Sequence, residues 1–168
     1  MSKVFISLGT NLGDKLKNLY TTIIEIKNNL GEVILISGKY ETEPWGFSAE
    51  ESFINMVILI DTNLQPVDLM KKILSIEKKM GRIRKKNKTG YESRVIDIDI
   101  LFYEDIIISN IWVKIPHPLI QHRRFILEPF NEIAKDFRHP VLNKRISELL
   151  AECQDEGKVK LIQSSSSV

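Results

Sequence analysis

The stretch "SRVIDIDILFY", residues 93–103, predicts the last strand of a buried sheet and places two aspartates in it. Side chains in a strand alternate between the two faces, so Asp97 and Asp99 share one face while the isoleucines around them share the other. Two carboxylates on one face repel each other and lose hydration. Protons, arginine side chains or a metal ion have to compensate for this repulsion and lost hydration. The rest of the sequence has to indicate which of the three does so.

The sequence before this strand predicts two helices and three further strands. Apolar residues recur at helical spacing up to Gly31 and again up to Gly81, while shorter apolar runs predict strands. The expected order is strand 3–8, helix 16–30, strand 32–44, strand 52–62, helix 66–80 and the final strand. This β-α-β-β-α-β order is typical of a ferredoxin-like α/β (α+β) fold, a mainly antiparallel sheet with helices packed on it. Shorter pieces follow in 104–150, with helices expected at 128–135 and 144–152.

Composition indicates one ordinary globular domain, which we expect to span 1–162 with a disordered tail at 163–168. The net charge of +2 is too small to argue for nucleic acid as a partner. The apolar runs are all shorter than the ~20 residues that a membrane helix needs, so we expect no membrane partner. The single Cys153 excludes an intramolecular disulfide and fits a reducing cytoplasm.

A basic segment directly precedes the aspartates, comprising Arg82, Arg84, Lys85, Lys86, Lys88 and Arg94. Alone, such a run is more often a solvated loop, and the acidic pair could simply bind a neighbouring arginine. Together they favour a polyanionic substrate that carries Mg²⁺, because Mg²⁺ takes a few carboxylate oxygens and completes its shell with phosphates and water. Arginines then bind the remaining phosphate oxygens. We also expect segment 82–95 to close over bound substrates.

Two other motifs are rejected as nucleotide-binding or zinc sites. "GTNLGDK" (9–15) lacks the P-loop spacing, so we interpret it as a turn into a helix, with Asn11 or Asp14 as the cap. His117 and His122 have no zinc spacing, and their basic neighbours would oppose a dication. A histidine that donates to phosphate fits better.

Two further sets of residues have both a structural and a functional interpretation. Glu77 is expected on the buried side of helix 66–80, where it either pairs with Arg82 or Arg84 or contacts a ligand. Phe53 and Asn55 share a face of strand 52–62. With Phe125, they either form a slot for a flat heterocycle or belong to the core.

Several motifs in this order resemble the 6-hydroxymethyl-7,8-dihydropterin pyrophosphokinase family of folate biosynthesis. The resemblance covers residues 3–150, and its most specific motif is Arg94-x-x-Asp97-x-Asp99. The supporting motifs are "SLGTNLGD", "YETEPWG", "FIN", "IEKKMGRIR" and "IPHPLIQHRRFIL". The chain departs from the family at Tyr91, where some members have tryptophan. It also departs at Pro118, Gln121 and Arg124, where others carry tyrosine, lysine and glycine. One interpretation is that Arg124 supplies the positive charge that this lysine brings to phosphate in those members.

The resemblance implies transfer of pyrophosphate from ATP to the hydroxymethyl group of the dihydropterin, with release of AMP. Asp97 and Asp99 would bind two Mg²⁺ ions. At the phosphates, the resemblance implies contacts from Arg84, Arg94, His117 and Arg123, and Arg82 would order the catalytic loop. Glu77 and the backbone at Ile100 would contact the nucleotide. Phe53 and Phe125 would stack on the pterin, Asn55 would hydrogen-bond it, and its edge would receive backbone contacts from Thr42, Pro44 and Trp45.

Two other functions compete with this one. A ferredoxin-like RNA-binding module would use the basic segment, but the chain lacks an aromatic strand of the kind such modules use to stack bases. A different Mg²⁺-dependent nucleotidyl or phosphoryl transferase would use the same acidic pair. We further expect a monomer, because the sequence shows no large exposed apolar helix face.

Overall fold

The computed structural model describes residues 1–43, 51–82 and 94–164. Within them, a six-stranded sheet has the order β5-β1-β4-β3-β8, and β2 also pairs with β4. The strands are β1 (Ser2–Thr10), β2 (Glu32–Ile36), β3 (Lys39–Thr42), β4 (Phe53–Thr62), β5 (Asp97–Tyr103) and β8 (Val159–Gln163), with a separate hairpin of β6 (Ile108–Ser109) and β7 (Lys114–Ile115). The helices are α1 (Lys15–Asn29), α2 (Pro66–Lys79), η1 (Ile120–His122), α3 (Arg124–Ala134) and α4 (Ile146–Glu152).

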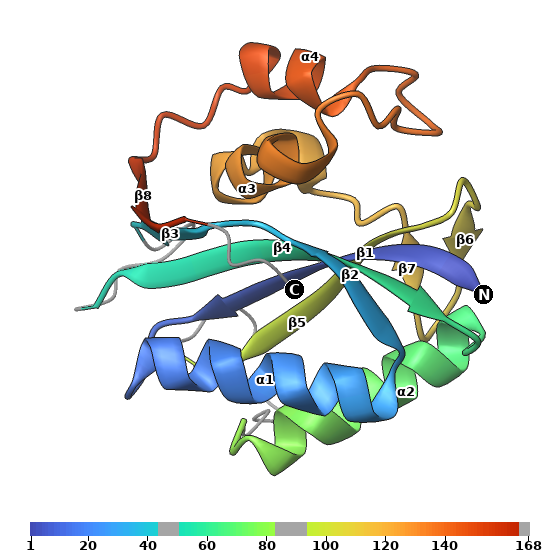
Figure 1. Cartoon of the computed structure of the whole chain (residues 1–168). Helices are drawn as coiled ribbons and strands as arrows, with labels where there is room; N and C mark the ends of the chain where they lie inside the picture. The colour runs from blue at the N-terminus through green and yellow to red at the C-terminus, as the bar shows by residue number, and fades with distance from the viewer. Residues whose placement is uncertain (44–50, 83–93, 165–168) are drawn as a thin grey trace.

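The sheet lies between two layers of helices (Figure 1). Helices α1 and α2 cover one face, and α3 covers the other, with α4 packed on α3 further from the sheet. The pairings of β1 with β4 and β5, and of β4 with β2 and β3, are all antiparallel. This is the β-α-β-β-α-β arrangement predicted from the sequence, and that prediction is confirmed.

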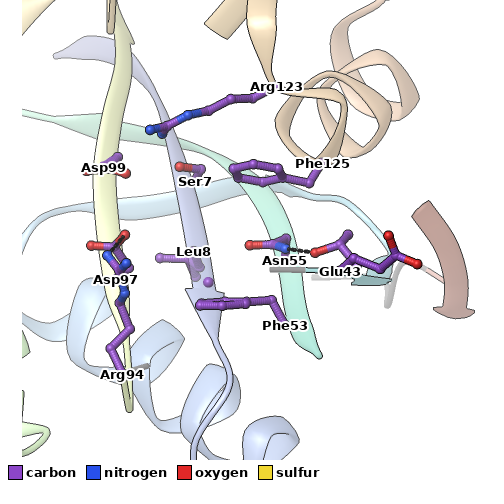
Figure 2. A pocket seen from close by; sticks show the side chains of 12 residues that line it. Ser7, Leu8, Glu43, Phe53, Asn55, Arg94, Asp97, Asp99, Arg123 and Phe125 are labelled. Carbon is purple, nitrogen blue, oxygen red and sulfur yellow. Dashed lines mark hydrogen bonds and ion pairs between the residues drawn. The ribbon is translucent and has the colours of Figure 1, made fainter. Parts of the chain in front are cut away.

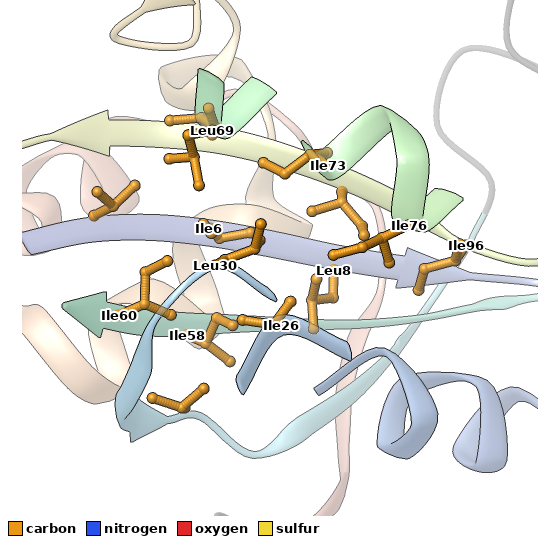
Figure 3. Packing of buried hydrophobic residues seen from close by; sticks show 14 of the residues in the cluster. Ile6, Leu8, Ile26, Leu30, Ile58, Ile60, Leu69, Ile73, Ile76 and Ile96 are labelled. Carbon is orange, nitrogen blue, oxygen red and sulfur yellow. The ribbon is translucent and has the colours of Figure 1, made fainter. Parts of the chain in front are cut away.

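Apolar side chains bury much of both faces of β1, β4 and β5. Between the sheet and the α1/α2 layer lie aliphatic residues such as Ile6, Ile58 and Ile73, each fully buried (Figure 3). Ile98 of β5 belongs to the same cluster and is 2% exposed. On the other face, Phe5 and its neighbours pack against α3 in a second cluster. Burying one such side chain contributes about 1.5–3 kcal/mol, so β1, β4 and the edge strand β5 are held from both sides.

The strand predicted at 32–44 is divided into β2 and β3 at Ser37. There the Ser37 hydroxyl accepts a hydrogen bond from the backbone N–H of Val57 (2.9 Å), and the Ser37 N–H donates to the Val57 carbonyl (2.9 Å). A side-chain oxygen thus replaces a backbone oxygen in the ladder, and the chain shifts relative to β4. Glu132 accepts the next N–H, that of Gly38, with both oxygens at 3.0 and 2.9 Å.

The C-terminal third differs most from the sequence-based expectation. Helix α3 begins at Arg124 rather than 128, with Pro129 inside it. Helix α4 begins at Ile146, close to the predicted 144. Strand β8 is not predicted by the sequence, and Gln163, expected in the disordered tail, is its last residue. Residues 165–168 lie outside the described part of the chain.

Helix α1 also exposes apolar side chains. Leu16, Tyr20 and Ile24 recur every fourth residue and keep 45%, 67% and 40% of their surface exposed. The monomer was expected because the sequence shows no large exposed apolar helix face, and the oligomeric state stays a prediction. Among the residues that the structure describes, no helix has the length and apolar character needed to cross a membrane.

Candidate active site

The α3-facing side of β1, β4 and β5 changes from apolar to mainly polar along the strands. Register places Gly9 of β1 opposite Asn55 of β4 on one side and Asp97 of β5 on the other. In the adjacent row of the same face, Ser7 lies opposite Asp99. Because side chains two residues apart share a face, these positions continue the row that Phe5 begins in the core. A polar floor thus forms where the apolar packing against α3 stops.

A cavity lies over this floor, and it is the principal candidate for an active site within the described residues. Its lining comes from β1, β3, β4, β5 and the start of α3: Ser7, Leu8, Gly9, Thr42, Glu43, Phe53, Asn55, Arg94, Asp97, Asp99, Arg123 and Phe125. Figure 2 shows its two ends, with the aspartates and arginines at one end and the two phenyl rings at the other.

The aromatic end has the form of a slot. Phe53 from β4 and Phe125 from α3 lie on opposite sides of Asn55 (Figure 2). Asn55 is 7% exposed, and its amide nitrogen donates to the Thr42 hydroxyl at 2.6 Å, which fixes the amide orientation. The amide oxygen of Asn55 is directed towards Gly9, because a Cβ added to Gly9 would lie 2.6 Å from it. Glycine at this position therefore leaves space for the amide.

At the other end, Asp97 binds two arginines. Its Oδ1 accepts from Arg82, and its Oδ2 accepts from Arg94 at 2.7 Å. The same Arg82 nitrogen donates to Glu77 at 2.5 Å, and Glu77 also accepts the Ile98 N–H at 3.0 Å. Burial alone would lower the pKa of the Arg82 guanidinium, but Asp97 and Glu77 outweigh it and raise that pKa. For Glu77, which is 1% exposed, the ion pair with Arg82 left open by the sequence is thus present.

Asp99 is less well compensated than Asp97. Burial first, and then the negative charge of Asp97, raises the pKa of the Asp99 carboxyl to about 7, although Arg123 opposes this shift. A nearby cation would stabilise the ionised form of such a buried carboxyl beside another negative charge. The donor set therefore fits Mg²⁺, which takes carboxylate oxygens. Within the described residues no group of three or more His, Cys, Asp or Glu side chains forms a metal site, so substrate and water oxygens would complete the coordination.

His117 follows β7 and is a neutral donor. Its Nδ1 accepts the Leu119 N–H at 3.2 Å, which leaves the proton on Nε2. Burial, and then the charge of Arg123, lowers the pKa of the His117 imidazole to about 4. At neutral pH this side chain donates one hydrogen bond and carries no charge.

The turn after β1 fixes the backbone at Arg94. Asn11 is fully buried; its side-chain oxygen accepts the Arg94 N–H at 2.7 Å, and its own N–H donates to the Arg94 carbonyl at 3.1 Å. Asp14, not Asn11, caps α1 by accepting the Lys17 N–H at 3.1 Å. The motif that failed as a P-loop thus contributes to the site by positioning an arginine.

Most residues predicted for the site come together at this cavity. Thr42, Phe53, Asn55, Arg94, Asp97, Asp99, Arg123 and Phe125 line it, and Arg82 and Glu77 contact its acidic end. The side chain of Ile100 lies in the core, so only its backbone is available to a ligand. Arg84, Pro44 and Trp45, together with Tyr91 and most of the predicted lid, lie outside the described residues.

Sequence reasoning missed Ser7, Leu8, Gly9 and Glu43, which also line the cavity. A signal for Ser7 and Gly9 was present, since they alternate with apolar residues along a strand, but the residues opposite them are known only from the sheet register. Arg124 does not fit its interpretation as a phosphate ligand. Its side chain is bound to the backbone carbonyls of Asp155 and Cys153, at 2.8 and 3.3 Å.

The chain is similar to known proteins along most of its length. The family model described as 7,8-dihydro-6-hydroxymethylpterin-pyrophosphokinase (HPPK) matches residues 5–135. A 2-amino-4-hydroxy-6-hydroxymethyldihydropteridine pyrophosphokinase of Aquifex aeolicus is 36% identical over 152 residues, which are 90% of this chain and 92% of that protein. The folic acid synthesis protein fol1 of Schizosaccharomyces pombe is 34% identical over 91% of this chain, which corresponds to 21% of that longer protein.

A solved structure supports the fold. The Plasmodium falciparum HPPK-DHPS triple mutant with SDX-DHP superposes with a TM-score of 0.74 at 20% identity, over 90% of this chain and 44% of that chain. This identity is low enough that the likeness shows the fold alone. The match of the family model over most of the chain, and the similarity to the Aquifex aeolicus relative along nearly its full length, show that the chain belongs to the 7,8-dihydro-6-hydroxymethylpterin-pyrophosphokinase family.

Proposed function

We propose that the cavity over β1, β4 and β5 transfers pyrophosphate from ATP to the hydroxymethyl group of 6-hydroxymethyl-7,8-dihydropterin, with release of AMP. The names of the family and of the Aquifex aeolicus relative describe a pyrophosphokinase of the hydroxymethyl dihydropterin, and the Schizosaccharomyces pombe relative is named a folic acid synthesis protein. The observation that carries the assignment is that an aromatic slot and an acidic pair open into one cavity. A flat acceptor in the slot would present its hydroxymethyl group to the acidic end.

At the slot, each side chain has a separate task. Phe53 and Phe125 would stack on the two faces of the pterin ring, and Asn55 would hydrogen-bond its edge. The Thr42 hydroxyl holds the Asn55 amide in one orientation (2.6 Å), so the amide is set before the ligand arrives. A preset orientation lowers the entropy lost on binding and aligns the acceptor for in-line transfer.

At the acidic end, Asp97 and Asp99 would hold Mg²⁺, and we expect two ions. When bound, Mg²⁺ neutralises phosphate charge and lowers the pKa of the attacking hydroxyl. Arg94, Arg123 and Arg84 would contact phosphate oxygens and stabilise charge on the transferring group. His117 would donate from Nε2 to a phosphate oxygen as a neutral group, consistent with its lowered pKa. Arg82 would order the catalytic loop, and Glu77 with the Ile100 backbone would border the nucleotide.

The product of the reaction tests this assignment. Incubation of the purified chain with ATP, Mg²⁺ and the dihydropterin should yield AMP and the pterin pyrophosphate in equal amounts, as measured by chromatography. Reactions without pterin, or with a chelator, should yield neither. ADP as the nucleotide product would instead indicate an ordinary phosphoryl transferase, and release of pyrophosphate would indicate a nucleotidyl transferase. Salt-dependent binding of single-stranded RNA without Mg²⁺ would favour the binding-module alternative.

We also propose that the chain works as a cytoplasmic monomer with small-molecule substrates alone. The small net charge of +2 gives no basis for a nucleic-acid partner, and the buried free Cys153 suits a reducing compartment. Sedimentation equilibrium at micromolar concentration measures the mass. A dimer mass that disappears when the exposed Tyr20 is replaced by serine would contradict the monomer and identify α1 as the interface.

A further inference from the structure

The first turn of α3 forms one wall of the cavity without a local cap. Arg123 and Phe125, on either side of the helix start, both line the cavity. A helix leaves its first backbone N–H groups without partners inside the helix, and a side chain just before the helix usually accepts one of them. Arg123 occupies that capping position, and its side chain makes no capping hydrogen bond.

A residue far along the sequence provides the missing cap. Asp155 Oδ2 accepts the backbone N–H of Arg124, the first residue of α3, at 3.0 Å. The other oxygen, Oδ1, accepts the N–H of Gly157 at 2.9 Å, which fixes the turn that carries the carboxylate. A negative charge at a helix N-terminus is favourable, because the backbone dipoles there point their positive ends outward.

The Arg124 side chain strengthens the same contact from the helix side. Its Nε donates to the Asp155 carbonyl at 2.8 Å and its Nη2 to the Cys153 carbonyl at 3.3 Å, while Nη1 pairs with Glu128 at 3.3 Å. Arg124 is therefore held outside the cavity, between two residues that line it. Its position alone would have suggested a ligand contact; its hydrogen bonds show an anchor.

The segment that carries Asp155 reaches a second wall of the cavity. After Gly157 the chain enters β8, which pairs with β3 so that Val159 lies opposite Thr42. Thr42 lines the cavity and orients Asn55. One C-terminal segment thus contacts the wall formed by α3 and the edge formed by β3. The match to the family model ends at residue 135, so this segment lies beyond it.

We propose that residues 153–159 act as a clamp on the pterin slot, in which Asp155 and Arg124 are positioning residues that hold Phe125 against the bound ring. The inference rests on the proposed function, because it takes the slot to be the pterin site. The proposal adds that Asp155 and Arg124 influence pterin affinity without contacting the pterin. The clamp keeps the first turn of α3 formed before the pterin arrives, so binding does not have to order it.

The expected effect follows from the size of a capping interaction. Loss of a side-chain cap changes a helix equilibrium by between about twofold and thirtyfold. Only the fraction of molecules with an intact first turn can bind, so apparent affinity falls with that fraction. Packing of Ile126, Leu127 and Phe130 in the core holds the rest of α3 and limits the effect to its start. For Asp155→Ala we expect the dissociation constant for pterin to rise about 3- to 10-fold.

Calorimetric titration of the full chain with 6-hydroxymethyl-7,8-dihydropterin, in the presence of Mg²⁺ and a non-hydrolysable ATP analogue, tests the clamp. The number of sites reports the folded fraction, and the dissociation constant reports positioning. Asp155→Ala should raise the constant at an unchanged number of sites. Asp155→Asn keeps one oxygen to accept a hydrogen bond and should give an intermediate value. Glu156→Ala, an exposed neighbour, is the matched control and should bind like the wild type.

Steady-state kinetics gives the second measurement. In Asp155→Ala, KM for the pterin should rise as the dissociation constant does, while kcat at saturating pterin stays within about twofold, because the chemical groups are untouched. Arg124→Ala retains the capped N–H and should show a smaller rise. A pterin affinity of Asp155→Ala within twofold of the wild type, or an equal loss in Glu156→Ala, overturns the clamp alone. A wild-type chain that does not bind pterin overturns the proposed function and the clamp with it.

Discussion

The two faces of β1, β4 and β5 differ in composition, although their residues alternate along the same strands. The face towards α1 and α2 is lined mainly by buried apolar residues, such as Leu8, Ile58 and Ile98. The face towards α3 is apolar around Phe5 and then carries small or polar residues: Ser7 and Gly9 on β1, Asn55 on β4, Asp97 and Asp99 on β5.

This difference explains how the sheet accommodates buried carboxylates that are energetically unfavourable. Asp99 is held where burial raises the pKa of its carboxyl to about 7, which is unfavourable for an ionised acid. Directly behind it, Ile98 and Ile100 lie in the other face at 2% exposure each. At Asp97 and Asp99, the buried isoleucines of one face supply stability and the carboxylates of the other face supply the chemistry. Substitutions on the two faces should therefore affect different measurements.

Replacing Asp97 by alanine should have the largest effect. The change removes a predicted Mg²⁺ ligand and the common partner of Arg82 and Arg94. The negative charge on the transferring group is then less well stabilised. We expect kcat to fall by roughly 10³-fold or more. Measuring the rate of AMP formation against Mg²⁺ concentration, with circular dichroism to verify folding, checks this prediction.

The matched control is Ile98→Val, one residue away on the opposite face. It should lower the free energy of unfolding by about 1 kcal/mol and leave kcat within about twofold. Near-normal turnover in Asp97→Ala would mean that the metal assignment is wrong. An equally large loss of kcat in Ile98→Val would show that the two faces do not divide stability from chemistry.

Adding one methyl group at Gly9 should have the next largest effect. A Cβ there would lie 2.6 Å from the amide oxygen of Asn55, so Asn55 has to move from the slot. Overpacking of this kind costs about 1–3 kcal/mol, and if it falls on the bound state, pterin affinity drops roughly 10- to 100-fold. Calorimetric titration of Gly9→Ala with pterin measures it. Binding at wild-type affinity would mean that the amide does not contact the ring.

The local features of this division were predictable from the sequence. Alternation in 93–103 predicted that Asp97 and Asp99 share a face away from the isoleucines, and alternation in 52–62 predicted the same for Phe53 and Asn55. Both predictions are confirmed, because a strand's period of two is a property of its own backbone. The order of strands and helices was predictable for a similar reason, since it follows from local periodicity and from glycine stops.

Features that depend on distant partners were not predictable. Gly9 became a site residue only through its register with β4 and β5. The start of α3 depends on Asp155, 31 residues downstream of the N–H that it caps, so no local signal places this start before the proline at 129. The break at Ser37 depends on a side chain that replaces the backbone in pairing with Val57. Each case requires a contact that no local pattern encodes.

Removing the Asn55 side chain should weaken pterin binding more moderately. Asn55→Ala loses a hydrogen bond to the ring edge and leaves the Thr42 hydroxyl without its amide donor. A hydrogen bond of this kind is worth about 0.5–1.5 kcal/mol, so we expect roughly a 3- to 10-fold loss of pterin affinity, with the affinity for an ATP analogue unchanged. Val57→Ala, two residues along the same face but inside the core, should lower stability and leave both affinities intact. Equal losses for both ligands in Asn55→Ala would contradict its place in the pterin slot.

The smallest effect concerns pH and the neutral His117. Burial, and then Arg123, holds the pKa of this imidazole at about 4, against an ordinary value of 6.5. Between these two values the unfolded chain binds a proton that the folded chain does not, so stability falls as pH drops from 6.5 towards 4. Asparagine retains an oxygen that can accept the Leu119 N–H and removes the titrating group. His117→Asn should therefore lose less stability than the wild type between pH 7 and 4.5, as measured by urea unfolding. His139 also has a lowered pKa, but it is common to both proteins and cancels in the difference. If the free energy of unfolding depended on pH identically in the two proteins, His117 would already be charged in the folded chain over this range. The polar end of the α3-facing side would then carry more positive charge than proposed.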